Sequence, residues 1–186
     1  MDEPTTRAAK RAATAQRIIE AAQIEFGERG LENATVRGIA QRAGVDPSLV
    51  IQHYGSKNDL FAVATRFDAT STDDEVAEHL FEVLDVRLAG LPPHIRALTR
   101  SMLTAPEATR IMREHLNERI ANLARTSDDP DAQLRAAVTV SGILGLTIAR
   151  HFLELDGLAD ISPAQVESVL RPWLTAALDV DTSPSP

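Results

Sequence analysis

The chain has 186 residues, of which 44% are apolar, 25% are charged and 4% are aromatic, and its formal net charge is −8. This composition is typical of a soluble globular protein, and the scarcity of aromatic side chains favours packed helices over a β-sheet. Because the sequence contains no cysteine, disulfide bonds, thiolate metal sites and cysteine nucleophiles are excluded.

The predicted elements are all helices, because apolar residues recur at helical spacing and no alternating strand pattern is long enough to indicate a sheet. Residues 1–6 are expected to be an unstructured lead-in, and residues 179–186 an unstructured tail. Between them we expect about nine helices, so the predicted fold class is all-α. The expected helices cover residues 8–29, 35–43, 47–54, 56–67, 71–90, 94–103, 104–125, 131–156 and 162–178.

Capping residues mark several of these boundaries. Gly30 is expected to end the first helix, and Asp46 to open the third. Gly157 is expected to end the long helix before it, and Ser162 forms a capping box with Gln165 at the start of the last helix.

The net charge is unevenly distributed along the chain. Residues 1–66 carry nine basic and eight acidic side chains, whereas residues 67–186 carry ten and nineteen. Such an asymmetry indicates a nucleic-acid-binding N-terminal part and a different role for the remainder.

The sequence predicts neither secretion nor a membrane segment. Its first residues are polar and acidic, and no apolar signal core follows them. The longest uncharged run, residues 136–149, is shorter than the roughly 20 residues that span a bilayer, and it contains hydroxyl side chains. We therefore expect a cytoplasmic protein.

The most informative pattern lies at residues 35–57, which read TVRGIAQRAGVDPSLVIQHYGSK. Two short helices are joined by Ala-Gly-Val, and the glycine permits the sharp bend of a helix-turn-helix. In this motif the second helix enters the major groove of DNA, and its first residues contact base edges. The residues alone leave one alternative open, a helical hairpin with an incidental Ala-Gly-Val turn.

This block resembles the DNA-binding signature of the tetracycline-repressor (TetR) family, in which a Thr-x-Arg-x-Ile-Ala helix, an Ala-Gly-Val turn and a recognition helix precede an aromatic residue, a short spacer and Ser-Lys. The segment IIEAAQIEFGERG is similar to the first helix of that family, and the resemblance covers about residues 14–67. It implies a transcriptional regulator and not an enzyme. The implied parts are a helix-turn-helix domain at residues 7–55, with its motif at 35–54, and a helical ligand-binding and dimerisation domain at 56–178.

The resemblance also implies which side chains contact DNA. Arg37 is expected to read a guanine edge, and Thr35 and Lys57 to bind phosphates. Ile51 stands where the family often has tyrosine, so an apolar base contact is expected there in place of a phosphate hydrogen bond. The full expected set is Thr35, Arg37, Pro47, Ser48, Leu49, Ile51, Gln52, His53 and Lys57.

Some basic and polar positions have plain surface roles as alternatives. Ser48 and Lys57 could be ordinary surface residues, and Arg29 and Arg42 are expected to be solvated. The first helix has a basic start, which consists of Arg7, Lys10 and Arg11. These residues form either an arm that reaches DNA or a solvated helix end.

The predicted helices over 131–156 and 162–178 carry more apolar surface than one exposed helix pair accommodates. Small residues recur at every fourth position of the first of them, which allows another helix to approach closely. In the family that the sequence resembles, these helices form a four-helix dimer interface, and the expected residues here are Ala137, Ser141, Gly145, Ala149, Val169 and Trp173. The alternative is that the strip packs into the core of one chain.

A malleable apolar pocket is expected between about residues 80 and 155. Its expected lining consists of Phe81, Leu84, Leu88, Met102, Met112, Leu116, Ile120 and Phe152.

No cofactor or metal is expected. His79 with Glu75, Glu78 and Glu82 has some character of a metal-binding helix, but a solvated acidic face explains these residues better, since a di-metal site needs the pattern on another helix as well. No nucleophile elbow, phosphate loop or His-Glu-x-x-His motif is present in the sequence.

The predicted function is a homodimeric repressor that binds a palindromic double-stranded DNA operator and is released by a small apolar effector. Two alternatives remain: an activator, and a helical ligand-carrying or enzyme-like protein that does not act on DNA.

Overall fold

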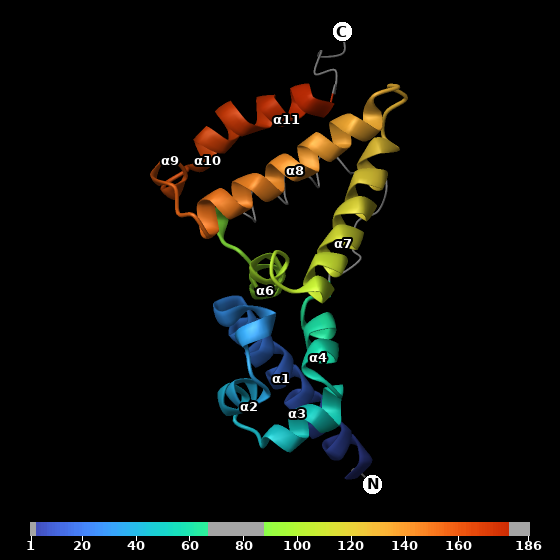
Figure 1. Ribbon diagram of the computed structural model, residues 1–186, viewed down its shortest axis with the longest axis vertical. Helices are drawn as coiled ribbons and strands as arrows, with labels where there is room; N and C mark the ends of the chain where they lie inside the picture. The colour runs from blue at the N-terminus through green and yellow to red at the C-terminus, as the bar shows by residue number, and fades with distance from the viewer. Residues whose placement is uncertain (1–2, 67–87, 179–186) are drawn as a thin grey trace. The chain divides into compact units, whose positions relative to one another are not determined.

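The computed structural model describes residues 3–66 and 88–178, and within these ranges it is helical without any β-strand (Figure 1). The predicted all-α fold class is therefore confirmed. The helix expected over residues 71–90 lies almost wholly outside the described residues, and the tail expected over 179–186 lies outside them altogether.

The described residues divide into two compact units. The first combines the residues up to 66 with Pro92–Arg113, and the second combines residues 88–91 with 114–178. Helix α7 (Pro106–Ala124) contributes residues to both.

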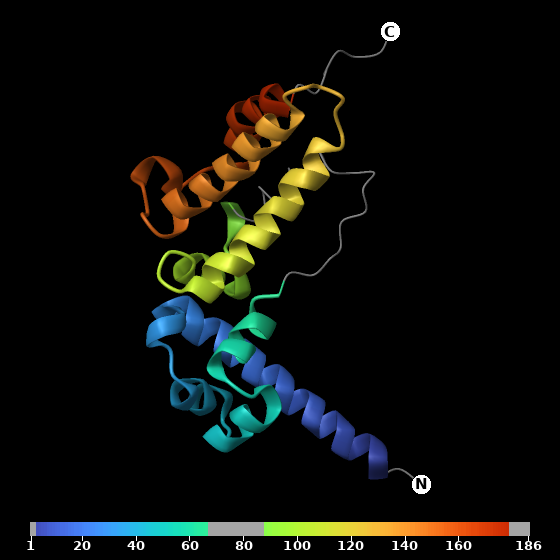
Figure 2. The same ribbon diagram turned by 45° about the vertical axis from the view of Figure 1, so that its right-hand side comes forward.

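Four helices form the N-terminal part of the first unit, and the last three of them begin behind a side chain that accepts a backbone N–H, as helix N-caps do. The N-terminal turns of α1 project beyond the other three helices (Figure 2). The helices are α1 (Glu3–Asn33), α2 (Val36–Ala43), α3 (Pro47–Tyr54) and α4 (Lys57–Ala64).

Helix α1 begins earlier than expected and is kinked at the residue where its end was expected. It is helical from Glu3, where an unstructured lead-in was expected, so the basic residues Arg7, Lys10 and Arg11 follow the first turn of the helix. At Gly30 the backbone leaves the helical conformation, with a φ of 75° and a ψ of 167°, so the long helix ends there as expected, and residues 31–33 form one further turn after the kink. The further turn lets Leu31 become buried, and Ala34 N–H bonds back to the Gly30 carbonyl at 3.1 Å.

The core of this unit forms where α1 meets α2 and α4. Phe26 and Phe61 are fully buried and meet edge to face, with ring centroids 5.0 Å apart and an interplanar angle of 83°. Ile18, Ile39 and Leu60 are fully buried as well. Their burial fixes α2 and α4 to the long helix α1.

Helix α6 (Pro93–Ser101) belongs to the same unit and packs against α1. Its buried residues include Ile95, Ala97 and Leu98. The first unit therefore extends past the helix-turn-helix domain expected at residues 7–55.

The second unit contains α8 (Ala132–His151), which packs against α11 (Arg171–Leu178), and the two lie side by side in both views (Figure 1, Figure 2). Two apolar clusters form its core. One consists of Leu88, Ile143 and Leu174 with their neighbours, and the other of Leu123, Ala136 and Val140 with theirs.

The predicted C-terminal helix boundaries are wrong in two places. Helix α8 ends at His151, and the turn that follows contains Glu154 at a φ of 51°. Gly157 therefore caps nothing and lies inside the short helix α9 (Asp156–Ala159).

The last predicted helix, 162–178, is divided into three segments. Ser162 and Gln165 do form the predicted reciprocal cap of α10 (Pro163–Gln165), with Ser162 N–H to Gln165 Oε1 at 2.9 Å and Gln165 N–H to Ser162 Oγ at 3.3 Å. The π-helical segment η2 (Val166–Leu170) follows, directly before α11. Its wider turn precedes Pro172, whose ring clashes with the carbonyl four residues earlier in a regular α-helix.

Helix α8 is the one helix among the described residues that is long and apolar enough to cross a membrane, judged by length and composition alone. Its mean hydropathy is 1.4, and a third of the tested window is buried within the protein. Helices that belong to the core of soluble proteins also pass this test, so it carries no argument for a membrane location.

Candidate nucleic-acid interface

The turn between α2 and α3 has the geometry of a helix-turn-helix. Gly44 ends α2 in the left-handed conformation, with φ 66° and ψ 40°, which glycine adopts without a steric cost. Asp46 then caps α3: its carboxylate accepts Ser48 N–H at 2.8 Å and the Ser48 hydroxyl at 2.5 Å, and Pro47 occupies the first helical turn.

Carboxylates close the N-termini of α3 and α4. The Ser48 hydroxyl and N–H hold the pKa of Asp46 below its usual value, and the Ser56 hydroxyl and N–H do the same for the pKa of Asp59. Both groups are therefore negatively charged at neutral pH. In contrast, α2 is capped by the neutral hydroxyl of Thr35, which accepts Gly38 N–H at 3.0 Å.

Helix α3 separates an anchoring side from an exposed side. Val50 is buried, and the Tyr54 hydroxyl donates to the Ala15 carbonyl of α1 at 2.8 Å. Burial raises the pKa of Tyr54, so its hydroxyl keeps the proton that it donates. Sequence reasoning treated Tyr54 only as the aromatic residue of a motif and missed this contact.

The residues expected to contact DNA lie mostly on the exposed side of this motif. The exposed ones are Thr35, Arg37, Pro47, Ser48, Ile51 and Gln52, while Leu49, His53 and Lys57 are half-buried. Ile51 is 46% exposed, which is a position suited to an apolar contact with a partner. The role of each residue at DNA remains a prediction.

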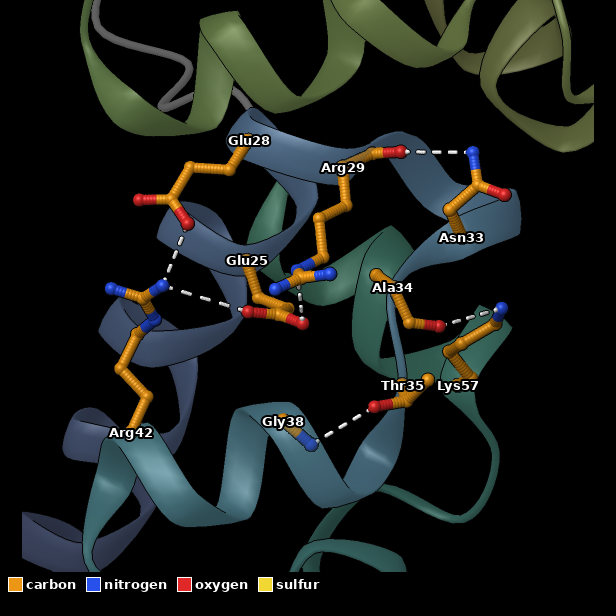
Figure 3. Close-up of polar contacts among 9 residues, drawn as sticks. All are labelled: Glu25, Glu28, Arg29, Asn33, Ala34, Thr35, Gly38, Arg42 and Lys57. Carbon is orange, nitrogen blue, oxygen red and sulfur yellow. Dashed lines mark hydrogen bonds and ion pairs between the residues drawn. The ribbon is translucent and has the colours of Figure 1, made fainter.

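Lys57 has protein partners that sequence reasoning did not foresee. Its Nζ donates to the carbonyls of Glu32 and Ala34, each at 3.1 Å (the second is drawn in Figure 3). A phosphate contact of the expected kind would have to use its remaining N–H.

Glu25 is a buried carboxylate at the centre of an ion-pair cluster between α1 and α2 (Figure 3). Its Oε1 lies 3.1 Å from Arg29 Nε and its Oε2 lies 3.6 Å from Arg42 Nη2, while Arg42 also binds Glu28 at 2.7 Å. A Cβ at Gly38 would come within 2.4 Å of Glu25 Oε1, so glycine lets α2 approach the carboxylate.

Arg29 and Arg42 are exposed, as expected of solvated residues, but each is also ion-paired, which the sequence did not predict. Sequence reasoning also overlooked Glu25. The available signal was its spacing, since it lies seven residues after Ile18 and three after Ala22 on the buried side of α1.

The strip of small residues on α8 faces away from the core of its own chain. A Cβ at Gly145 would meet nothing within 4 Å, and the buried side of α8 is formed by other residues, Ala136, Thr139, Val140, Ile143 and Thr147. The expected interface residues Ala137, Ser141, Gly145, Ala149, Val169 and Trp173 are half-buried or exposed in the single chain.

Trp173 contacts α8 at a glycine that was not singled out from the sequence. A Cβ at Gly142 would come within 2.5 Å of the Trp173 ring. The indole is nevertheless 42% exposed, and two apolar neighbours of the strip, Leu134 and Val138, are more exposed still.

The structure distributes the expected pocket residues over several surroundings. Leu88 packs with Ile143 and Leu174, whereas Leu116 and Ile120 pack around Leu123. Met102 and Met112 are buried and Phe152 is half-buried, while Phe81 and Leu84 lie outside the described residues. A common pocket remains a prediction.

The acidic cluster around His79 also lies outside the described residues. Within residues 3–66 and 88–178, no group of three His, Asp or Glu side chains is arranged to hold a metal ion.

Comparisons with known proteins cover both parts of the chain. The family model described as bacterial regulatory proteins, tetR family, matches residues 18–64, and the model described as tetracyclin repressor-like, C-terminal domain, matches residues 73–178.

Two curated relatives are HTH-type transcriptional repressors named AcnR. The one from Corynebacterium diphtheriae is 32% identical over 130 residues, which are 61% of this chain and 68% of that protein. The one from Corynebacterium efficiens is 28% identical over 84% of this chain and 93% of that protein.

Solved structures agree with this picture. A transcriptional regulator from Rhodococcus sp. Rha1 is 25% identical, with a TM-score of 0.55 over 89% of this chain and 92% of that one. Salmonella enterica GusR, at 17% identity, shares the fold with a TM-score of 0.61 over 89% of this chain and 95% of its own.

The ion-pair cluster gives a prediction about stability. Glu25→Gln removes the buried charge that two guanidinium groups bind, and we expect the free energy of unfolding to fall by about 1–3 kcal/mol, since both arginines can still reach water. Glu28→Gln is the matched control: the Glu28 side chain is 54% exposed, so its loss should cost less than about 0.5 kcal/mol. Urea unfolding of the two variants measures the difference, and equal losses would show that Glu25 contributes no more than a surface pair.

Proposed function

Since the chain belongs to the TetR family of bacterial transcriptional regulators, whose members bind DNA and are not enzymes, we propose that it is a homodimeric repressor. Each subunit places α3 into a major groove of a palindromic operator, and a small apolar effector releases the dimer. The relatives named as repressors support this over an activator. As a regulator of transcription in a bacterial family, the protein acts in the cytoplasm.

The observation that carries the proposal is the division of α3 into an anchored and an exposed side. Val50 and Tyr54 fix the helix to its unit, and Ser48, Ile51 and Gln52 are exposed. The Ser48 oxygen and the Gln52 amide suit the donor and acceptor groups of base edges, and Ile51 suits a thymine methyl. Pro47, Leu49 and His53 complete the proposed contact surface of α3.

The N-terminus of α2 is the proposed phosphate site. Asp46 at the cap of α3 and Asp59 in the first turn of α4 place a negative charge at the positive end of each helix, whereas α2 has the uncharged cap Thr35 and no acidic residue in its first turn. A phosphate at α2 thus gains the attraction of the helix end, and the Glu25 carboxylate beside Gly38 is paired with two arginines. Arg37 is exposed in the first turn of α2, two residues after Thr35. We therefore propose that it reads a base next to the bound phosphate.

Arg37 provides the test of DNA reading. Arg37→Ala should weaken binding to an operator, selected from random DNA by the wild-type protein, by roughly 1–3 kcal/mol and relax the preference at one base pair. Arg113→Ala, which removes an exposed arginine of α7, is the control and should leave binding unchanged. Equal losses on the operator and on unselected DNA would contradict base reading by Arg37.

Dimerisation through α8 and α11 is supported by the exposed apolar side chains beside the strip of small residues. Leu134, Val138 and Val169 are more than half exposed in the single chain, a pattern that marks protein interfaces. In a two-fold symmetric interface each subunit presents the same strip, so every residue of the strip acts twice.

Gly145→Gln tests this interface. A long side chain on the strip should force the two copies of α8 apart and give a folded monomer by light scattering. Gly157→Gln is the control, because Gly157 also faces open space but lies in α9. Operator affinity should fall when the dimer is lost, since a monomer contacts only one half-site. A dimeric Gly145→Gln protein would rule out the strip as the interface.

An effector must bind the DNA-free state more tightly than the DNA-bound state, because equal affinity shifts nothing. A small apolar compound that binds the native protein should raise its melting temperature. Operator DNA should weaken its binding by the same factor by which the compound weakens operator binding. A thermal-shift screen identifies such compounds, and titration of each one with and without operator measures the coupling. Compounds whose affinity does not change with operator would contradict the sensor role and leave a DNA-binding dimer.

A further inference from the structure

The chain between α1 and α2 is a short bent segment that sets the direction of the helix-turn-helix. The bend begins at Gly30, whose positive φ turns the backbone, and ends at Thr35, the N-cap of α2. Within the segment, Ala34 N–H bonds to the Gly30 carbonyl at 3.1 Å. Side chains from two other helices bind three more of its backbone groups, the Leu31 N–H and the Glu32 and Ala34 carbonyls.

Lys57 of α4 holds the carbonyl side of this segment. Its single ammonium group donates to the Glu32 and Ala34 carbonyls, both at 3.1 Å. Glu32 lies in the single turn that follows the kink at Gly30, where carbonyls without a helical partner favour a charged donor. Hydrogen bonds from a charged donor are stronger than neutral ones, so this contact is a strong constraint on the segment.

Ser101 of α6 holds the N–H side. Its hydroxyl accepts Leu31 N–H at 2.9 Å and donates to the Ala97 carbonyl at 2.8 Å, and the residue is fully buried. The segment is thereby fixed from two directions, and its last carbonyl, at Ala34, immediately precedes Thr35.

We propose that Lys57 is a positioning residue for DNA binding and not a phosphate anchor. By fixing the carbonyls of Glu32 and Ala34, it sets where Thr35 and the free N–H groups at the start of α2 point. This inference rests on the phosphate contact proposed for the N-terminus of α2. The ammonium group is directed at the protein and the residue is half-buried, which is the arrangement of a structural clamp.

The two roles differ in their dependence on salt. A lysine that neutralises one phosphate changes the slope of log binding constant against log salt by about 0.9. A lysine that acts through the uncharged N–H groups of α2 changes the affinity and leaves the slope as it is. A lysine that only stabilises the fold lowers the melting temperature and leaves the affinity of the folded protein unchanged.

The test uses Lys57→Met, which keeps the apolar stem and removes the ammonium group, in the full-length protein. Binding to the selected operator duplex is measured over a range of salt concentrations, well below the melting temperature of each variant. Positioning predicts about tenfold weaker operator binding, an unchanged salt slope, and no further loss when Thr35→Ala is added, since the contact is already displaced. Asn58→Met, which puts the same side chain on the next, exposed residue of α4, is the control.

A reduced salt slope with equal losses on unselected DNA would assign Lys57 to a phosphate, and unchanged affinity with a lower melting temperature would assign it to stability alone; either overturns the proposal. Lys57→Arg serves if the methionine variant does not fold. Arginine keeps the charge, so a phosphate anchor predicts wild-type affinity, whereas its planar fork does not reproduce one nitrogen bound to two carbonyls and positioning predicts a loss. A wild-type protein that selects no DNA sequence would instead overturn the proposed function, and this inference with it.

Discussion

The contact of Phe26 with Phe61 joins α1 to α4, and the DNA-facing part of the protein depends on it. Both rings are fully buried and meet edge to face, an arrangement worth about 0.5–1.5 kcal/mol beyond the burial of their area. With α4 fixed, Lys57 at its start reaches the end of α1. Tyr54 and Arg42 bring α3 and α2 to the same helix. Helix α1 is thus the common support of all three short helices.

Much of the helix-turn-helix could be predicted because its signals are local. Thr35, Asp46 and Ser56 cap helices a few residues away, and the left-handed turn needs a glycine where Gly44 stands. The contacts that were missed join residues distant in sequence. Lys57 reaches back more than twenty residues to Ala34, and nothing in the residues around it distinguishes a clamp from a phosphate ligand. The end of α8 and the division of the last helix depend likewise on backbone geometry near Glu154 and Pro172, which periodicity does not register.

The charge distribution pointed to the N-terminal part as the one that binds DNA, but it did not show that several basic residues there have partners within the protein. Arg29, Arg42 and Lys57 contribute to the basic N-terminal part, yet all three bind acidic side chains or carbonyls of their own unit. Their charge serves the relative placement of the helices. The exposed Arg37 is then a larger share of the charge available to a partner than the composition suggests.

The eight residues of α3 serve two separate purposes: one side holds the helix in place, and the other forms its exposed surface. Val50 and Tyr54 specify where the helix sits, while Ile51 and Gln52, between them in sequence, are exposed. Exchanges at the exposed positions alter the surface that we propose contacts DNA and leave the buried contacts of α3 unchanged. Such a helix can acquire a new DNA target through a few substitutions while the helices that hold it stay the same. A gene duplicate of this protein can therefore diverge toward another promoter through variants that all remain folded.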